Sequence, residues 1–376
     1  MDPQLRMLLE TSYEAIVDAG YDPDTLRKRN IGVFIGNTTS DSSVAYQKDA
    51  KKMDGYFALG CCTAMFSNRV SFSLDVQGPS MTIDTACTSS MVALCEAVLA
   101  LRSGRCEAAI VGGANLNLDP HLALNFKRLG VLSEDGKCKT FDASEDGYVR
   151  SEAIGCMFLQ RISDARRIYA KVINANANTD GYKPEGIPYP SASAHELLLR
   201  ATYAEANVDP RKVEYVEAHG TGTKAASPQE LTAISSALCP PGREKPLKVG
   251  SVKSNMGHAE SASGIASVAK VILAMETGTI AANLHFKEPR PDIPSLHDGR
   301  VEVVARPTQF YGGLVGISSQ GIGGTNAHAI FEPKQGLHVD DLPREKTDLP
   351  RLVLMAGRNK ASLLVSAKKV VADNLL

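Results

Sequence analysis

Short apolar runs alternate with segments of helical periodicity along most of the chain. The runs Ile31–Gly36 and Ala108–Gly113 are bounded by glycines, which is typical of buried strands. Further strands are expected at residues 80–84, 156–160, 169–174, 213–217, 247–251, 315–318 and 328–331. Helices are expected at residues 4–19, 91–103, 195–206, 228–238 and 262–276. This alternation predicts a layered α/β architecture with mostly parallel sheets, built from two similar halves that meet near residue 165.

The amino-acid composition of the chain changes after Pro333. Residues 334–350 are polar and rich in charge, which is typical of a linker. An apolar run follows at Leu352–Met355, and a helix is expected from there to the end of the chain. Because about forty residues cannot form a core of their own, this tail is expected to be the start of a further domain.

Composition excludes several classes of protein. Hydrophobic residues make up 43% and charged residues 22%, which is ordinary for a folded chain and excludes one that is mostly disordered. The net charge of −1 gives no electrostatic case for binding nucleic acid or an anionic membrane surface. No apolar run approaches the roughly 20 residues of a membrane span, and the first residues do not form a signal peptide. We therefore expect a cytoplasmic protein.

The 8 cysteines are scattered, and no CxxC pair is present. Reduced thiols that pack as small core residues are the simplest interpretation. Cys87 differs, because it lies between an expected strand and the start of a helix. Backbone N–H groups and the helix dipole at that place favour the thiolate, so the pKa of Cys87 is expected to fall below that of a free thiol. The alternative is a buried cysteine that only packs.

Two histidines stand at equivalent places. His219 follows one expected strand and begins a loop rich in glycine and threonine, and His258 follows another, close to Lys253. Both places suit acid–base chemistry, although a capped turn and a helix N-terminus are the structural alternatives. The loop 321–326 is rich in glycine but fits neither a Walker A loop nor a dinucleotide fingerprint. It can still direct backbone N–H groups at an oxyanion.

Taken together, these motifs resemble the β-ketoacyl synthase family of condensing enzymes. The sequence of these motifs is similar to that of the ketosynthase domain of animal-type fatty acid synthases and related type I polyketide synthases. The pieces that carry the resemblance are MDPQLRMLLE, DTACTSS, AAIVGGAN, CKTFDASEDGYVRSE, EAHGTGTK, SVKSNMGHAE and GIGGTNAHAI. The resemblance implies a thiolase-like fold with two similar halves in a layered α-β-α-β-α arrangement. Its domains would be residues 1–164, an N-terminal half that lacks its first strand, residues 165–333, the C-terminal half, and residues 334–376, a linker and the start of a following linker domain.

The resemblance also implies a reaction. The family joins an acyl group on cysteine to a malonyl-type carrier-protein thioester by decarboxylative Claisen condensation, which gives a 3-oxoacyl thioester. The implied catalytic residues are the nucleophile Cys87, the oxyanion-stabilising His219 and His258, and Lys253. The implied substrate-binding residues are Thr221 and Thr223, which would hold the pantetheine arm, and Ile322, whose N–H would complete an oxyanion hole with that of Cys87. The domain would bind no cofactor of its own, and its substrates would be carried on phosphopantetheine of acyl carrier protein or on CoA.

The implied partners are the acyl carrier protein domain, the neighbouring acyltransferase and linker domains of the same synthase, and a second copy in a homodimer. The sequence departs from the family pattern at three places. A phenylalanine is usual at Ile322, where it gates the acyl pocket, and another is common at Gln320. Gly-Asp is usual at Ala226-Ser227, so a carboxylate is missing close to Thr223.

Three other interpretations stay open at this point. Thiolase-like cleavage is one, although thiolases use a second cysteine where this chain has the histidine pair and Lys253. A truncated, inactive chain that serves only in dimerisation or as a scaffold is the second. A metal site formed by Cys87 and the two histidines is the third, and metal analysis would test it. The sequence does not specify the acyl chain length, the extender unit or a fatty acid rather than polyketide product.

Overall fold

A computed structural model describes residues 1–48, 54–334 and 359–372. The chain divides into a compact unit of residues 1–335 and a second unit of residues 336–376. In the second unit the described element is helix α11, Lys360–Ala372, which is the helix expected in the tail. Apart from Lys334, the predicted linker 334–350 and the apolar run 352–355 lie outside the described residues.

Two sheets organise the first unit. The first sheet has the order β2-β1-β3-β4 and the second has the order β5-β12-β11-β6-β7-β9. The strands of the first sheet are β1 Ile31–Gly36, β2 Ser80–Ile83, β3 Ala108–Asn115 and β4 Ala153–Gln160. Those of the second are β5 Ala170–Thr179, β6 Val213–Glu217, β7 Leu247–Gly250, β9 Val301–Val303, β11 Leu314–Gln320 and β12 Thr325–Pro333. A short antiparallel pair joins β8, Thr279–Ile280, and β10, Thr308–Gln309.

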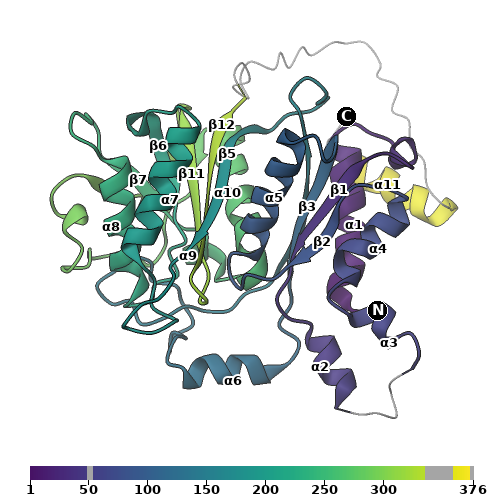
Figure 1. The fold of residues 1–376 in the computed structure, drawn as a ribbon, viewed down its shortest axis with the longest axis horizontal. Coiled ribbons are helices and arrows are strands. Elements are labelled where there is room, and N and C mark those ends of the chain that lie inside the picture. Colours follow the sequence, from purple (N-terminus) through teal and green to yellow (C-terminus); the bar gives the residue numbers. More distant parts are fainter. Residues whose placement is uncertain (49–53, 335–358, 373–376) are drawn as a thin grey trace. The chain divides into compact units, whose positions relative to one another are not determined.

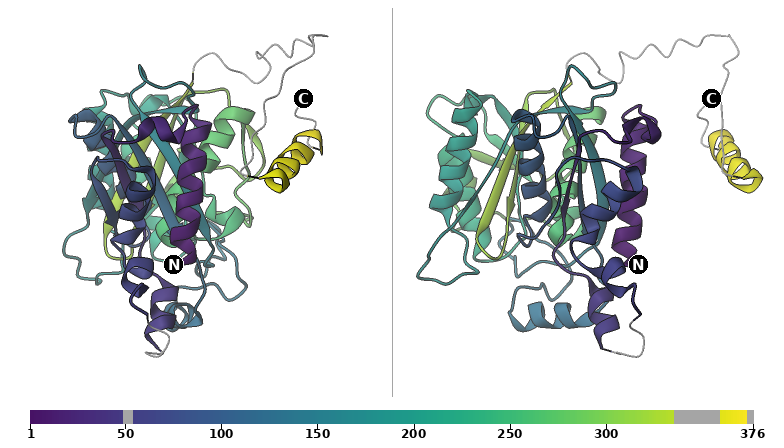
Figure 2. Two further views of the ribbon diagram at one scale, coloured as in Figure 1. Left: turned by 90° about the vertical axis from the view of Figure 1, so that its right-hand side faces the viewer. Right: turned by 45° about the vertical axis from the view of Figure 1, so that its right-hand side comes forward.

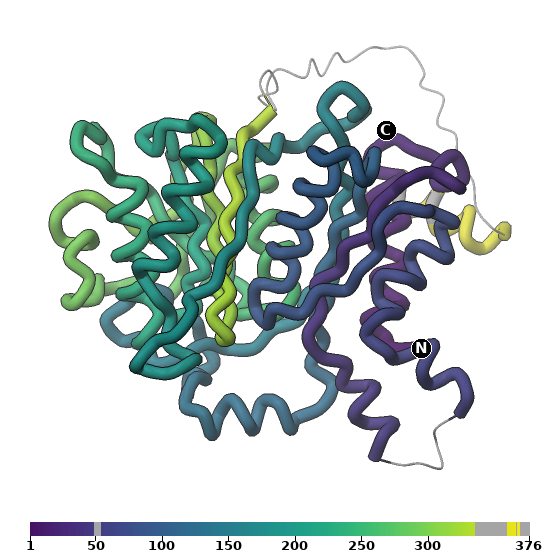
Figure 3. The backbone as a smooth tube through the Cα atoms, viewed as in Figure 1, coloured from purple at the N-terminus to yellow at the C-terminus, as the bar shows by residue number. Residues whose placement is uncertain are grey.

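The two sheets repeat one topology. In the first, β1 is parallel to both β2 and β3, and β4 is antiparallel to β3. In the second, β6 is parallel to both β7 and β11, and β12 is antiparallel to β11. Strand β5 adds to the free side of β12, whereas none of the strands described in the first unit pairs with the equivalent side of β4. The expected similarity of the two halves is therefore present in the strand order. Figure 3 traces the chain through both halves by colour.

Helices form three layers around these sheets (Figures 1 and 2). Helices α1, Pro3–Asp18, and α4, Met65–Leu74, cover the outer face of the first sheet. Helices α5, Ser89–Arg102, and α10, Ser263–Thr277, lie between the sheets and contact strands of both. Helices α7, Ala192–Glu205, and α8, Ala226–Leu238, cover the outer face of the second sheet. Shorter helices are α2 Asp41–Gln47, α3 Phe57–Cys61, α6 Pro120–Arg128 and α9 Lys253–Met256.

The composition of the helices explains the layers. Helix α5 is apolar nearly all round, which is the pattern of a helix buried on both faces. Its side chains join those of β3, β11, β12 and α10 in one core cluster between the sheets. Helix α1 buries one stripe, which includes Leu5, Leu8 and Ile16, against the first sheet. The fold therefore places α5 at the centre of the first unit, with its N-terminus at the boundary between the halves.

Candidate active site

The residues predicted to react follow three parallel strands. Cys87 follows β2, His219 follows β6, and Lys253 and His258 follow β7. In each half these residues therefore lie at the carboxyl end of parallel strands, at the lower edge of the sheets in Figure 1. The topological repeat makes β2 and β7 equivalent, so the nucleophile candidate and one histidine loop occupy related positions in the two halves.

A tight turn carries Cys87 from β2 into α5. Ala86 has a φ of 54°, in the left-handed region that residues with a Cβ rarely adopt. Side chains hold this turn: Asp84 accepts a hydrogen bond from the N–H of Ala86 at 3.0 Å, and Ser89 accepts one from the N–H of Thr85 at 3.0 Å. The strained turn fixes where the thiol of Cys87 points.

The second half supplies the surroundings of Cys87. Its carbonyl oxygen accepts hydrogen bonds from Ser263 Oγ at 3.0 Å and from Ser319 Oγ at 3.2 Å. The backbone N–H groups of Ile322 and of Cys87 itself both act to lower the pKa of the thiol. A Cβ at Gly321 would meet the carbonyl oxygen of Thr85 at 2.6 Å, so only glycine lets the loop approach so closely. The two N–H groups predicted for an oxyanion hole therefore both influence this thiol, and their role stays a prediction.

The prediction of a lowered pKa for Cys87 is wrong. Burial, with a smaller contribution from the carboxylate of Glu260, raises the pKa of Cys87 to about 11. The Lys253 ammonium and the two N–H groups act in the opposite direction but do not outweigh the loss of solvation. The sequence shows the position of the thiol at the helix start, but it does not show which groups of the second half surround it; in the fold Cys87 is half-buried.

Glu230 holds the loop that begins at His219. One of its carboxylate oxygens accepts the backbone N–H of His219 at 2.6 Å, and the other accepts that of Gly220 at 2.8 Å. The carbonyl of His219 accepts from Ser251 Oγ at 3.2 Å, which ties the loop after β6 to the loop after β7. Gly220 has a φ of 50°, and a Cβ there would meet the Cβ of Ser251 at 2.6 Å. The backbone of this loop is thus fixed, and Nδ1 of the His219 ring has no hydrogen-bond partner among the described residues.

Hydrogen bonds of both its backbone N–H and its carbonyl hold His258 in place. Its N–H donates to the carbonyl of Val149 at 2.7 Å, and its carbonyl accepts from the N–H of Ser151 at 2.9 Å. The ring Nδ1 accepts from the N–H of Glu260 at 3.3 Å. That contact assigns the ring proton to Nε2, which is buried and has no hydrogen-bond partner in the described part of the chain. His258 therefore presents a free N–H donor.

The two imidazoles lie next to each other and are neutral at neutral pH. Their ring centroids are 5.3 Å apart at an interplanar angle of 88°. Burial holds the pKa of His219 and that of His258 well below the ordinary value, and the Lys253 ammonium lowers both further. Lys253 is itself buried, and desolvation lowers its pKa although the carboxylates of Glu217 and Glu230 oppose the change. Lys253 and both histidines therefore influence one another electrostatically.

Thr221 and Thr223 lie on the same loop as His219. Their hydroxyls are 3.4 Å apart, and Thr221 is buried. Gly222 between them has a φ of 79°, and a Cβ there would approach the backbone nitrogen of Lys139 to 3.0 Å. Within the described ranges, no hydrogen bond joins either hydroxyl to Cys87. The structure therefore brings the two threonines together with His219 and leaves their contact with a substrate as a prediction.

A segment of the first half ties the two histidine loops together. We call residues 138–151 the crossing segment. Thr140 Oγ1 donates to the carbonyl of Gly220 at 2.6 Å, and the N–H of Gly147 donates to the carbonyl of Gly222 at 3.0 Å. Val149 and Ser151 hold His258, as described above, and Arg150 pairs with Glu260. The site is therefore assembled from both halves, with the crossing segment between them.

The carboxylates that hold the two histidine loops were not predicted from the sequence. Glu230 lies on α8 among buried apolar side chains, and Glu217 is the last residue of β6. Glu217 accepts the N–H of Val252 at 2.5 Å and pairs with Lys270 at 2.8 Å. The signal for Glu230 was a charged residue on the apolar face of an expected helix. A buried charge without a nearby partner in the sequence indicates a backbone or ionic partner elsewhere in the fold.

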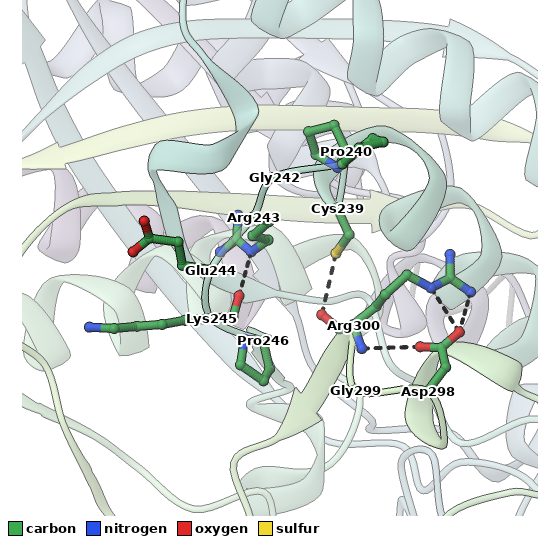
Figure 4. Close-up of a pocket in the computed structure, with 11 residues that line it drawn as sticks. Cys239, Pro240, Gly242, Arg243, Glu244, Lys245, Pro246, Asp298, Gly299 and Arg300 are labelled. Atoms are coloured by element: carbon green, nitrogen blue, oxygen red, sulfur yellow. Dashed lines mark hydrogen bonds and ion pairs between the residues drawn. The ribbon is translucent and has the colours of Figure 1, made fainter.

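A cavity of about 400 Å³ lies away from these residues (Figure 4). It is lined by residues 239–246 and 298–300. The arginines that line it have partners within the protein. Arg243 donates to the carbonyls of Pro210 and Leu238, and Arg300 pairs with Asp298. None of the predicted site residues lines it, and the cavity therefore belongs to the packing of loops at the end of the second sheet.

Neither a metal centre nor a membrane span is found in the part of the chain that the structure describes. There, no group of three or more His, Cys, Asp or Glu side chains is arranged to hold a metal ion. Cys87 and the two histidines therefore do not form a metal-binding group in this arrangement. Across the same residues, no helix has both the length and the apolar character needed to cross a membrane.

Comparisons with known protein families cover nearly the whole chain. The family model described as "Beta-ketoacyl synthase, N-terminal domain" matches residues 1–165, and "Beta-ketoacyl synthase, C-terminal domain" matches residues 169–287. A third, "Ketoacyl-synthetase C-terminal extension", matches residues 289–374.

Individual proteins show the same likeness. The chain is 51% identical over 278 residues to a fatty acid synthase of the goose Anser anser anser, covering 74% of this chain and 79% of that relative. It is 41% identical over 355 residues to a phenolphthiocerol/phthiocerol polyketide synthase of Mycobacterium tuberculosis, covering 91% of this chain but only 19% of that much longer relative.

Solved structures agree with these sequences. The ketosynthase from module 6 of the bacillaene synthase of Bacillus subtilis aligns with a TM-score of 0.82 at 35% identity, over 89% of this chain and 60% of that one. An oxazolomycin ketosynthase domain of Streptomyces albus aligns with a TM-score of 0.83 at 33% identity, over 89% of this chain and 60% of that one. The layered α-β-α-β-α fold with two similar halves, predicted from the sequence, is confirmed.

Proposed function

Because the chain belongs to the β-ketoacyl synthase family, whose members form carbon–carbon bonds, we propose the following roles for its own residues. Cys87 attacks the carbonyl of an acyl thioester on phosphopantetheine, and the pantetheine thiol leaves with the proton. The acyl group then rests on Cys87. The two N–H groups that act to lower the pKa of this thiol would stabilise the oxyanion that forms during the transfer.

The second half-reaction uses the histidine pair. A malonyl-type thioester on the carrier loses CO₂, and the electrons of the broken bond form an enolate. The enolate carbon attacks the acyl carbonyl on Cys87, the carbon–sulfur bond breaks, and a 3-oxoacyl thioester leaves on the carrier. Neutral imidazoles that donate to the thioester oxygen lower the energy of the enolate, and each such donor contributes about 3 kcal/mol. Burial keeps both rings neutral by lowering their pKa values, and the Lys253 ammonium adds to this effect.

One observation carries the proposal. The Nε2–H of His258 is a buried donor with no partner among the described residues, and Nδ1 of the neighbouring His219 is also unpaired. Buried polar atoms are rarely left unpaired, so an adjacent pair of them favours a substrate oxygen as the missing partner. Thr221 and Thr223, on the loop of His219, would hold the pantetheine arm.

The wider setting follows from the relatives, which are multidomain synthases. The chain spans about a fifth of the mycobacterial relative, so the activity of a whole synthase is part of the proposal. We propose an acyl carrier protein domain and neighbouring acyltransferase and linker domains as partners, a homodimer as the assembly, and a cytoplasmic location. The division into residues 1–164, 165–333 and 334–376 also stays a proposal. The inactive-scaffold alternative is not favoured, since the family match extends across both halves.

The experiment is intact-protein and peptide mass spectrometry after incubation with a panel of acyl thioesters. We expect acylation confined to Cys87, and none in the Cys87→Ala variant. A folded wild-type sample that takes up no acyl group would contradict the proposal. Release of CO₂ from malonyl thioester tests the second half-reaction. His258→Ala is expected to slow it by a factor of about 100, and an unchanged rate would remove that histidine from the mechanism.

A further inference from the structure

A buried polar cluster lies beside the loop that carries Thr221 and Thr223. It consists of Glu145 on the crossing segment, Ser227 in the first turn of α8, and Arg290. Glu145 is 2% exposed. One of its carboxylate oxygens accepts from Ser227 Oγ at 2.7 Å, and the other pairs with the Arg290 guanidinium. This cluster joins the first half to the start of α8.

Arg290 extends the cluster to the threonine loop itself. Its Nη1 donates to Glu145 and also to the carbonyl of Lys224 at 3.1 Å, one residue after Thr223. Its remaining N–H groups pair with Asp292. A single guanidinium therefore links the crossing segment, the threonine loop and the loop after Pro289.

Helix α8 begins without a carboxylate of its own. Its N-cap residue Ala225 makes no side-chain cap, and its first turn holds no acidic residue. The N–H groups of Ala226 and Ser227 turn back to the carbonyl of Thr223 at 3.0 and 3.2 Å. A negative charge is favourable at a helix N-terminus, and Glu145 brings one there through Ser227. The helix start and the position of Thr223 therefore depend on the same contacts.

We propose that Glu145 is a positioning residue that, together with Arg290, holds the loop of Thr221 and Thr223 in the geometry that binds the pantetheine arm of the substrate. The inference rests on the proposed function. It also accounts for the departure at Ser227: the acidic residue usual there is absent, and the carboxylate comes instead from a segment 82 positions earlier in the chain.

Burial destabilises the charged form of Glu145. Burial raises the pKa of its carboxyl group to about 7, against the opposing effects of Ser227 and Arg290. If the side chain at this position only filled space, an uncharged residue could do the same without the unfavourable burial of a charge. Its two oxygens are instead both used, one for each partner.

The first test measures the loop directly, by hydrogen exchange of the backbone amides of residues 222–227 in the full chain. Glu145→Ala is expected to speed exchange there about tenfold, because the local opening loses a charge-assisted hydrogen bond. Adding Ser227→Asp to that variant returns a carboxylate to the start of α8 and is expected to restore slow exchange. Glu134→Gln, a change at an exposed glutamate before the crossing segment, is the matched control.

Glu145→Gln covers the case in which the alanine variant does not fold, because it keeps the size and the Ser227 contact but loses the charge. Exchange unchanged in the folded variants, or a failure of Ser227→Asp to restore it, would overturn the inference. This readout requires no activity, so it fails or succeeds independently of the proposed function.

The second test uses the acylation of Cys87. Two donors with the same acyl group are compared: a pantetheine thioester and an N-acetylcysteamine thioester, which lacks most of the arm. Glu145→Ala is expected to raise KM about tenfold for the pantetheine thioester and to leave KM for the N-acetylcysteamine thioester within about twofold. Adding Ser227→Asp to this variant is expected to bring KM for the pantetheine thioester back toward the native value. Equal losses on both donors would show a general structural role and overturn the inference. If the native chain acylates with neither donor, the proposed function fails, and the exchange experiment still decides the role of Glu145.

Discussion

The thiol of Cys87 is protonated at neutral pH, because burial holds its pKa at about 11. Alkylation requires the thiolate, so the rate of reaction with iodoacetamide at Cys87 is expected to rise about tenfold per pH unit between pH 7 and 10. Peptide mass spectrometry follows this residue separately from the other cysteines. Glutathione in the same tube is the control, since its rate levels off above its own pKa of about 8.5 to 9. A plateau for Cys87 below pH 8 would contradict the effect of burial.

Ile322 is smaller than the phenylalanine usual at its place, and it is 37% exposed beside the sulfur of Cys87. We expect this smaller gate to admit a wider range of acyl groups. Ile322→Phe is then expected to lower long-chain relative to short-chain acylation of Cys87 by about tenfold, a usual magnitude for steric discrimination in an apolar pocket. Competition between acyl thioesters measures the ratio, with Ile162→Phe at an exposed position as control. An unchanged chain-length profile would count against the gate.

At the scale of elements, the contact between α5 and α10 depends on Gly264. A Cβ there would meet Met91 Cγ at 2.4 Å and Ser90 Oγ at 2.8 Å, and the N–H of Gly264 donates to Ser90 Oγ at 3.1 Å. Gly264→Ala is expected to lower the free energy of unfolding by about 1–3 kcal/mol in urea denaturation, because the close-packed central layer has to move apart. Gly55→Ala is the control, since no atom lies within 4 Å of its Cβ position. Equal stabilities would show that the layer adapts without strain.

Gly264→Ala is also expected to affect the candidate active site at Cys87. Ser263, the first residue of α10, donates to the carbonyl of Cys87, so a shift between the helices moves the turn that holds the nucleophile. We therefore expect Gly264→Ala to slow acylation of Cys87 more than its loss of stability alone would.

Local pattern predicted the elements of the sheets well. Strands β1 and β6 have the expected ends. Strand β1 is a continuous apolar run, which is the pattern of a buried strand in a parallel sheet. Helices α2, α4 and α6 were not predicted; α2 and α6 bury few or no side chains and so carry little apolar pattern. For the site, the Cys, His and His positions at strand ends were predictable from local sequence. The pKa of Cys87 and the roles of Glu230 and Glu145 were not, because they depend on contacts between residues distant in the sequence.

At the scale of the whole molecule, the buried histidines set the response to acid. His195 and His328 are fully buried, and burial lowers their pKa values to about 4 and about 3. His219 and His258 behave alike, with pKa values well below the ordinary value. Each is neutral in the folded chain at a pH where the unfolded chain binds a proton. Between pH 6.5 and about 4 the unfolded state therefore takes up more protons, and stability falls as the pH falls.

Glu145 and Glu230 act in the opposite direction, since burial raises their pKa values to about 7. Both carboxyl groups are charged above pH 7; below it the folded chain binds protons on them that the unfolded chain does not yet bind, but four histidines outweigh two glutamates below pH 6.5. Net loss of stability on acidification is the result.

His328 allows this balance to be tested one group at a time. Its ring lies between Ser318 Oγ at 2.9 Å and Tyr203 at 3.2 Å, and Gln can contact both hydroxyls without titrating. Urea denaturation from pH 6 to 4.5 measures how steeply the free energy of unfolding depends on pH. His328→Gln is expected to reduce that slope by about 1.4 kcal/mol per pH unit, because one proton fewer is taken up on unfolding. His285→Asn, at an exposed histidine with a φ of 62°, is the control for replacing a histidine outside the core. The same slope in His328→Gln and in the native chain would mean that this ring is already protonated in the fold, and that its burial does not make the molecule sensitive to acid.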